Sequence, residues 1–262
     1  MRLVRFSLDP ATPATTPDVS PLVRYGVAEN ETVYETAPGW TARTGASWPL
    51  GQVRLLPPCW PSKIVCVGRN YEEHAKELGN LAPAEPVIFL KPPSALAAHG
   101  DPIVLPPLSQ RVDYEGEIGV VIGRRARNVP AERAHEYILG YTCVNDVTAR
   151  DLQKKDVQWT RAKGFDTFCP VGPWIAPATE VNLDQLRLRT WVNGDLKQQA
   201  SPADMIFPVA RIIAFVSEVM TLEPGDLIAT GTPAGVGPLS PGALVKIEIE
   251  GVGVLENRVT PA

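Results

Sequence analysis

Three acidic residues lie in stretches of sequence that are otherwise typical of buried β-strands. Glu115 and Glu117 stand two residues apart in the stretch 113–122, and Asp146 interrupts the apolar run 141–147. Because side chains alternate along a strand, positions i and i+2 point to one face, about 7 Å apart. Two buried carboxylates so placed repel each other unless one takes up a proton or a cation lies between them. Oxygen donors at this density suit Mg²⁺ or Mn²⁺, and the alternative is an exposed strand face with solvated acids.

A second group of polar residues lies in the segment 68–79, where we expect a short helix. Asn70 can cap this helix and Gly79 can end it. His74 and Glu77 then fall at positions i and i+3 on one face, within hydrogen-bonding reach. A carboxylate that orients an imidazole and stabilises its cation makes a general base for water. The alternative is a surface helix on which both side chains are only solvated.

Cations and a glycine-rich turn could bring an anion to these acids. Three carboxylates around one dication leave a net negative charge, so an anionic substrate would need further cations nearby, and Arg69, Arg150 and Lys163 are the candidates. The turn 230–237 can offer backbone N–H groups and hydroxyls to an anion, but it lacks the spacing and the lysine of a phosphate-binding loop. The alternatives are solvated surface cations and a plain glycine-rich hairpin.

Composition excludes several classes of partner. The chain has 262 residues and a net charge of −4, with lysine and arginine spread along it, so we expect neither nucleic acid nor an anionic membrane as a partner. Its four cysteines are irregularly spaced, which favours free buried thiols in a reducing cytosol. No run resembles a signal peptide or a membrane span, and a cytoplasmic protein is expected.

Patterning favours a β-rich α+β fold over a parallel doubly wound sheet. Short strands with polar, proline-containing connections indicate a small β-rich N-terminal domain over residues 1–60, and candidate strands recur through a principal domain over residues 61–262. Asn193-Gly194 predicts a hairpin with a type I′ turn. One helix is expected after Pro208, where apolar residues recur at helical spacing. No dinucleotide-binding glycine fingerprint is present.

Six motifs, in the same order along the chain, resemble those of the fumarylacetoacetate hydrolase family, in particular its acylpyruvase and 2-hydroxyhepta-2,4-diene-1,7-dioate isomerase members. The resemblance runs from about residue 61 to the C-terminus, and the motifs are Gly68-Arg-Asn-Tyr-Glu-Glu-His-Ala-Lys-Glu77, Phe89-Leu-Lys-Pro92, Tyr114-Glu-Gly-Glu-Ile-Gly-Val-Val121, Asn145-Asp-Val-Thr-Ala-Arg-Asp-Leu-Gln153, Arg161-Ala-Lys-Gly-Phe165 and Thr230-Gly-Thr-Pro-Ala-Gly-Val236. It implies a catalytic domain built as a mixed β-sandwich roll, usually a homodimer. It also implies one Mg²⁺ or Mn²⁺ ion per subunit, held by Glu115, Glu117 and Asp146.

The same resemblance implies roles for further residues. His74 and Glu77 match a pair on a short helix that orders over bound substrate, and Lys163 matches a substrate-contacting position, where we expect it to stabilise developing oxyanion charge. The remaining positions are expected to bind substrate, and they are Arg69, Tyr71, Arg150, Gln153 and Thr232. For Thr232 we expect both the backbone and the hydroxyl to hold the substrate carboxylate.

The expected activity is metal-dependent hydrolysis of a carbon–carbon bond in a 2,4-dioxo acid, an acylpyruvate or a fumarylacetoacetate-like compound, with the cation as Lewis acid for the departing enolate. Isomerisation of 2-hydroxyhepta-2,4-diene-1,7-dioate, and decarboxylation of 5-oxopent-3-ene-1,2,5-tricarboxylate or oxaloacetate, need the same chelate and stay open as alternatives. The choice among them would rest on the loops 80–85 and 156–160. A metal- and oxo-acid-binding protein without turnover is a further alternative, although His74 and Lys163 are both present.

Overall fold

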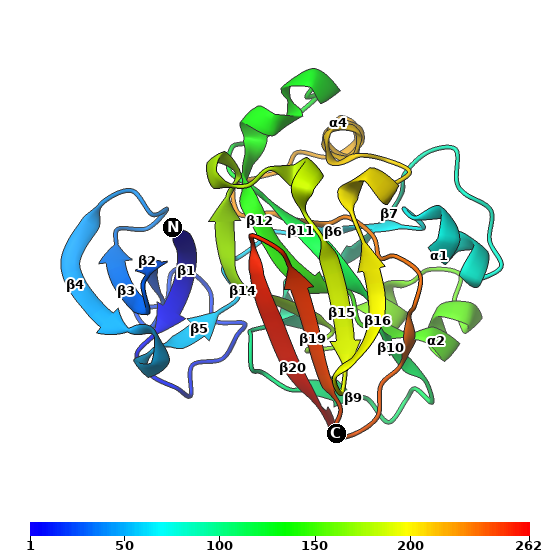
Figure 1. Cartoon of the computed structure of the whole chain (residues 1–262), viewed down its shortest axis with the longest axis horizontal. Helices are drawn as coiled ribbons and strands as arrows, with labels where there is room; N and C mark the ends of the chain where they lie inside the picture. Colours follow the sequence, from blue (N-terminus) through cyan, green and yellow to red (C-terminus); the bar gives the residue numbers. More distant parts are fainter.

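The computed structural model describes residues 1–262, and its first strands form an antiparallel meander (Figure 1). Each strand pairs with the next, and a short fifth strand pairs with the first on its other side. These strands are β1 (Arg2–Ser7), β2 (Arg24–Glu29), β3 (Thr32–Thr36), β4 (Arg43–Pro49) and β5 (Arg54–Leu56). The expected small β-rich N-terminal domain is confirmed.

The meander continues the main sheet of the larger domain, because β1 also pairs with β14 at Leu3 and Ile175. The strand order is β4-β3-β2-β1-β14-β12-β11-β17-β6-β7, and β8 pairs with β14 beside this path. The strands of the larger domain are β6 (Ile64–Gly68), β7 (Val87–Lys91), β8 (Leu96–Ala97), β11 (Gly116–Ile122), β12 (Ile138–Asn145), β14 (Cys169–Pro177) and β17 (Leu227–Ala229). Since one sheet crosses residue 60, a domain boundary at that residue stays a prediction.

A second sheet packs against the first, and a third sheet consists of three short strands. The second has the order β16-β15-β19-β20-β9, and the third has the order β13-β10-β18. Their strands are β9 (Ile103–Leu105), β10 (Val112–Tyr114), β13 (Thr148–Ala149), β15 (Leu188–Val192), β16 (Asp195–Ala200), β18 (Gly237–Pro238), β19 (Leu244–Ile249) and β20 (Gly253–Pro261). Buried residues such as Ile118 of β11 and Ile247 of β19 fill the core between the two large sheets. Parallel pairs such as β6 with β17 make the fold mixed, which confirms the expected β-rich class.

Helices are short and few. The α-helices are α1 (Glu72–Glu77), α2 (Arg150–Lys155), α3 (Thr160–Lys163) and α4 (Val209–Val219), and the 3₁₀ turns are η1 (Leu50–Gln52), η2 (Pro93–Ala95), η3 (Ala131–Tyr137), η4 (Ala178–Glu180), η5 (Leu183–Gln185) and η6 (Pro202–Asp204). In Figure 1, α1 and α2 lie on the side of the molecule opposite the N-terminal strands. None of these helices has the length and apolar character needed to cross a bilayer.

Two local predictions are confirmed and one is wrong. Pro208 precedes α4, and Asn193 and Gly194 both adopt positive φ angles in the hairpin between β15 and β16. Asn70, however, does not cap α1, whose N-cap is Tyr71. The Asn70 amide instead bonds the backbone of Phe207 and the Thr230 carbonyl, because these tertiary partners lie within its reach. The four cysteines are free and buried, as expected.

Candidate functional site

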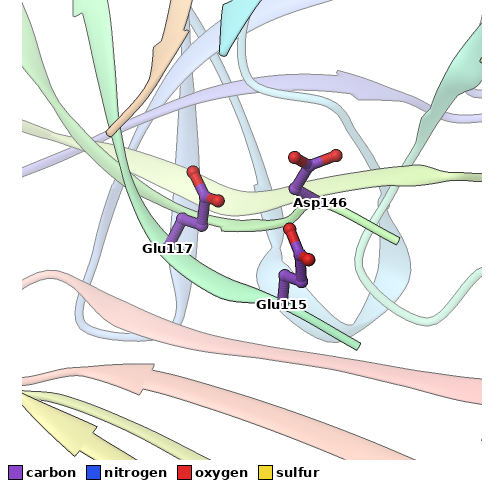
Figure 2. Close-up of side chains that lie close together, drawn as sticks. All are labelled: Glu115, Glu117 and Asp146. Carbon is purple, nitrogen blue, oxygen red and sulfur yellow. The ribbon is translucent and has the colours of Figure 1, made fainter. Parts of the chain in front are cut away.

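Three carboxylates converge at the start of β11 and the end of β12. Glu117 lies on β11, Glu115 directly precedes that strand, and Asp146 directly follows β12. The antiparallel register places Gly116 opposite Asn145, and the Asp146 N–H donates to the Glu115 carbonyl at 2.9 Å. One oxygen from each carboxylate can therefore lie within 4.8 Å of the others, and all three residues are buried. Figure 2 shows the three side chains side by side, pointing into the same space.

The glycine between the two glutamates is required by the opposite face of the strand. A Cβ at Gly116 would lie 2.1 Å from the Thr190 hydroxyl oxygen of the second sheet. The Gly116 N–H donates to the Gln198 amide oxygen at 3.0 Å, so the second sheet approaches the backbone directly. Only glycine leaves room for this contact, and the contact fixes the strand segment that carries both glutamates.

Two lysines neutralise part of the acidic cluster. Lys163 donates from its ammonium group to Glu115 Oε2 at 2.8 Å and to Asp146 Oδ2 at 2.6 Å. Lys91 donates to Asp146 Oδ1 at 2.6 Å. Burial works to lower the pKa of Lys163, but Asp146 and Glu115 outweigh it and raise that pKa, so the side chain stays cationic. Lys163 can therefore stabilise developing negative charge.

An arginine holds Glu115 from the other side. Arg150 donates to Glu115 Oε1 at 2.6 Å and to Asp113 Oδ2 at 3.0 Å, and it also donates to the Gln153 amide oxygen at 2.8 Å. Although burial opposes it, the charges of Lys163 and Arg150 hold the pKa of Glu115 below its ordinary value. The Gln153 amide oxygen accepts this bond and the amide nitrogen donates to no protein atom, so its N–H groups are free to donate to a ligand.

Glu117 is the carboxylate without a cation. It is 1% exposed and accepts a hydrogen bond from the Gly231 N–H at 2.8 Å. Burial, together with the charges of Asp146 and Glu115, raises its pKa well above the ordinary value. A buried carboxylate in such surroundings is costly unless it is protonated or meets a cation.

The charges and donors together fit a hard divalent cation. Four buried carboxylates face three buried cations, and the exposed Arg111 also pairs with Asp113, so the local charge is close to zero and a dication would make it positive. The carboxylates are Asp113, Glu115, Glu117 and Asp146, and the cations are Lys91, Arg150 and Lys163. The three converging acids offer oxygen donors alone, which is the donor set that Mg²⁺ and Mn²⁺ prefer.

A histidine and a glutamate face the same space from α1. His74 Nδ1 lies 3.3 Å from Glu77 Oε2, so the structure brings the pair within reach as the spacing predicts. His74 is buried, and Glu77 also accepts a hydrogen bond from the Gly235 N–H at 3.1 Å. With Nδ1 turned toward the carboxylate, Nε2 is the nitrogen left to exchange a proton with a ligand or water.

One cavity of about 500 Å³ collects nearly all of the expected site residues. Its lining includes Arg69, His74, Glu77, Glu115, Glu117, Asp146, Arg150, Gln153, Lys163 and Thr232. Tyr71 is not part of this lining, and its hydroxyl is buried without a hydrogen-bond partner. The structure thus brings together every predicted site residue except Tyr71.

Comparison with known proteins matches two segments of the chain to family models. Residues 63–260 match the family model described as fumarylacetoacetate (FAA) hydrolase C-terminal, and residues 1–58 match the one described as Rv2993c-like, N-terminal. The first match spans well over half of the chain. The chain belongs to the fumarylacetoacetate hydrolase family.

Named members of the family differ in their reactions. A 2-hydroxyhepta-2,4-diene-1,7-dioate isomerase from Mycobacterium marinum is 49% identical, with a TM-score of 0.87, over 100% of this chain and 98% of that one. A mitochondrial oxaloacetate decarboxylase from Dictyostelium discoideum is 46% identical over 72% of this chain and 89% of its own. A maleylpyruvate hydrolase from Sphingobium sp. SYK-6, in complex with manganese(II) ion and pyruvate, is 34% identical over 100% of both chains, with a TM-score of 0.79. This chain is accordingly an enzyme of a family that includes hydrolases, isomerases and decarboxylases.

Within this fumarylacetoacetate hydrolase fold, one expected contact needs revision. The Thr232 hydroxyl donates to the Gly116 carbonyl at 2.9 Å and accepts from the Gln198 amide at 2.8 Å. Its proton is engaged, so the hydroxyl cannot donate to a substrate carboxylate without breaking that bond. The Thr232 backbone N–H donates to no protein atom, which leaves it as the donor that this residue offers.

Residue types alone did not reveal three further members of the site. Lys91 supports Asp146, Gln198 supports Gly116 and Thr232, and Trp159 lies on the cavity wall with its ring centroid 5.3 Å from that of Phe89. The available signal was a lysine at the end of an otherwise apolar strand, because a buried lysine is rare unless it is paired. No local signal marks Gln198, whose role depends on the approach of the second sheet.

Proposed function

We propose that this enzyme hydrolyses a carbon–carbon bond in a 2,4-dioxo carboxylic acid such as an acylpyruvate. The observation that carries the proposal is the position of His74 and Glu77 in the same cavity as Glu115, Glu117 and Asp146. A general base for water and a site for an anionic oxo acid within one cavity are the two requirements of this reaction.

In the proposed reaction His74 removes a proton from water, and Glu77 stabilises the imidazolium that forms. The water oxygen bonds to the C4 carbonyl carbon, and the bond between C3 and C4 then breaks. Its electron pair passes to the three-carbon half, which takes up a proton to become pyruvate, while the acyl half leaves as a carboxylic acid. The Lys163 ammonium stabilises the negative charge that develops on oxygen.

The anionic end of the substrate would meet several donors of the chain. A divalent cation held by Glu115, Glu117 and Asp146 would supply a Lewis acid for the carboxylate and the 2-oxo group. The free amide N–H groups of Gln153 and the backbone N–H of Thr232 can donate to the same carboxylate. The Sphingobium relative with manganese and pyruvate supports this arrangement, since pyruvate is the product that the proposal requires.

Decarboxylation of oxaloacetate is a second candidate, and isomerisation of a hydroxydienedioate is a third. The Dictyostelium discoideum relative favours the former and the Mycobacterium marinum relative favours the latter. Both reactions pass through the enolate of a 2-oxo acid, so they can use the same acids and the same lysine. Neither needs water to attack carbon, and this difference separates them from hydrolysis.

Replacement of the proposed base tests the choice. We expect His74→Ala to lower the hydrolysis of acetylpyruvate with Mn²⁺ roughly a hundredfold or more, because an activated water is lost. Decarboxylation of oxaloacetate should fall far less, and both rates can be followed by the absorbance of the oxo acids. His135→Ala, at an exposed position on η3, is the matched control. Equal losses in both reactions would remove His74 from the role of water base, and absence of hydrolysis in the wild type would refute the proposal.

A further inference from the structure

The helix that carries His74 and Glu77 is attached to the rest of the protein by hydrogen bonds at each end. The bridge between Tyr71 and Met205 attaches its N-terminal end, and the hydrogen bonds of residues 74–80 are internal to residues 71–80 with one exception. This exception joins Glu77 to the Gly235 N–H, at 3.1 Å for Oε1 and 3.3 Å for Oε2. On the outer face of α1, Glu72 and Lys76 are exposed and pair only with each other. The contact with Gly235 therefore has a large share in holding the C-terminal end of α1 over the cavity.

Gly235 is itself held from the opposite side. Its carbonyl accepts a hydrogen bond from the Tyr114 hydroxyl at 2.8 Å. Gly235 has a φ of +101°, and a Cβ there would lie 2.0 Å from the Lys197 carbonyl oxygen, so no other residue fits. Tyr114 is 3% exposed and pairs with Gly237 in the ladder between β10 and β18. The glycine is thus fixed between a buried tyrosine and the acid of the dyad.

We infer, on the basis of the proposed function, that Tyr114 is a positioning residue for the His74–Glu77 dyad. Its hydroxyl fixes the Gly235 backbone, the Gly235 N–H orients Glu77, and Glu77 orients His74. Tyr114 directly precedes Glu115 in the chain, so a single strand segment supports both the candidate metal ligand and the base. We call this series of hydrogen bonds from Tyr114 through Gly235 to Glu77 the tether. It joins residues far apart in the sequence, since Gly235 lies 121 positions after Tyr114 and 158 positions after Glu77.

Hydrogen exchange tests the tether without reference to any reaction. In Tyr114→Phe, which loses only the hydroxyl, amides of residues 72–80 should exchange about three- to tenfold faster, as expected for the loss of one hydrogen bond that supports a local structure. Glu77→Ala should have a similar or larger effect. The double variant should exchange no faster than Glu77→Ala, because both changes break the same connection. Tyr141→Phe is the matched control, since Tyr141 is a mostly buried tyrosine whose hydroxyl makes no hydrogen bond to the protein and which lies outside the cavity lining.

Unchanged exchange in Tyr114→Phe, or additive effects in the double variant, would overturn the inference. The Mn²⁺ affinity of Tyr114→Phe, measured by calorimetry, should equal that of the wild type, and a clear loss would show that the tyrosine acts on Glu115 instead. If Tyr114→Phe does not fold, Glu77→Ala still tests the outer end of the tether, because unchanged exchange of residues 72–80 in that variant would overturn the inference as well.

Activity supplies the second readout. Hydrolysis of acetylpyruvate by Tyr114→Phe should lose kcat by several-fold with little change in KM, because the base is displaced while the anion-binding groups stay in place. A changed KM with an unchanged kcat would contradict a positioning role. If the wild type hydrolyses no oxo acid, the proposed function fails, while the exchange measurements still decide whether the tether exists.

Discussion

At the scale of single residues, the site is governed by how each carboxylate is compensated. Glu115 and Asp146 have lysine or arginine partners at 2.6 to 2.8 Å, whereas Glu117 has only a backbone N–H. Removal of one partner of a buried ion pair is destabilising, but removal of an uncompensated buried charge can stabilise the protein. We therefore expect Glu117 to destabilise the fold when no metal is bound and to be essential for metal binding.

A pair of glutamate substitutions tests this difference. Glu117→Gln should weaken Mn²⁺ binding roughly a hundredfold or more in calorimetry. Even the loss of a residue that only hydrogen-bonds to a metal ligand can weaken metal binding by up to that factor, and Glu117 would contact the metal itself. Without metal, the same variant should melt about 2 to 4 °C higher for each kcal/mol of charge repulsion that it removes. Glu115→Gln is the matched comparison and should melt lower than the wild type, because Lys163 and Arg150 lose a charged partner. Similar melting shifts in the two variants would contradict the assignment of Glu117 as the uncompensated acid.

The sequence contained enough to predict the acids and the dyad, because their spacing on one strand and on one helical turn is local. The partners of these residues depend on contacts between distant segments. Lys91 reaches Asp146 across 55 positions, and Gln198 reaches Thr232 across 34. For the same reason, residue types did not reveal that Asn70 bonds Phe207 instead of capping α1, or that the proton of the Thr232 hydroxyl is engaged.

At the scale of elements, turns and the main helix follow from local sequence, while strand order does not. The positive φ angles at Asn193 and Gly194 and the start of α4 after Pro208 depend on the residues themselves. The parallel pairing of β6 with β17, far apart in the chain, has no local signature. The convergence of the three acids could be predicted only through family resemblance, because it needs the register of β11 against β12.

The hairpin between β15 and β16 provides a test at this scale. Gly194 has a φ of +87°, and no atom lies within 4 Å of the point that a Cβ would occupy, so Gly194→Ala adds backbone strain without a clash. We expect it to lower the free energy of unfolding by about 1 kcal/mol in urea titrations. Gly51→Ala is the control, because that site is equally open and lacks a positive φ. An equal effect of the two substitutions would mean that the turn does not need its glycine.

A histidine that follows β8 contacts β20 and gives a pH test. His99 accepts a hydrogen bond from the Glu256 N–H, and burial lowers its pKa although Glu256 and Asp101 act to raise it. Because the pKa in the folded state lies below that in the unfolded chain, acidification below about pH 6.5 adds more protons to the unfolded state and reduces stability. The wild type should therefore lose more free energy of unfolding between pH 7 and 5 than His99→Gln, measured by urea titration. Identical pH profiles would show that His99 does not contribute.

At the scale of the whole molecule, the small N-terminal meander and the catalytic domain share one sheet through β1 and β14. Residues of α1 and α2 line the cavity, and these two helices lie on the side of the molecule opposite the N-terminal strands (Figure 1). The chain carries a net charge of −4, so attraction of an anionic substrate depends on the local balance at the acids and not on the overall field.

Membership of the family supports the expectation of a homodimer. Light scattering coupled to gel filtration should give a mass about twice the 28.4 kDa of one chain, because each subunit would pair with an identical copy. A mass that stays at 28.4 kDa across the concentration range would contradict this expectation.

The most direct test is a crystal structure of the protein grown with Mn²⁺, with anomalous diffraction used to locate the metal. The account predicts one strong anomalous peak per subunit, with oxygen atoms of Glu115, Glu117 and Asp146 in its coordination shell and Lys163 moved off at least one of these acids. A peak bound elsewhere, or three unligated carboxylates with Lys163 still between Glu115 and Asp146, would contradict it.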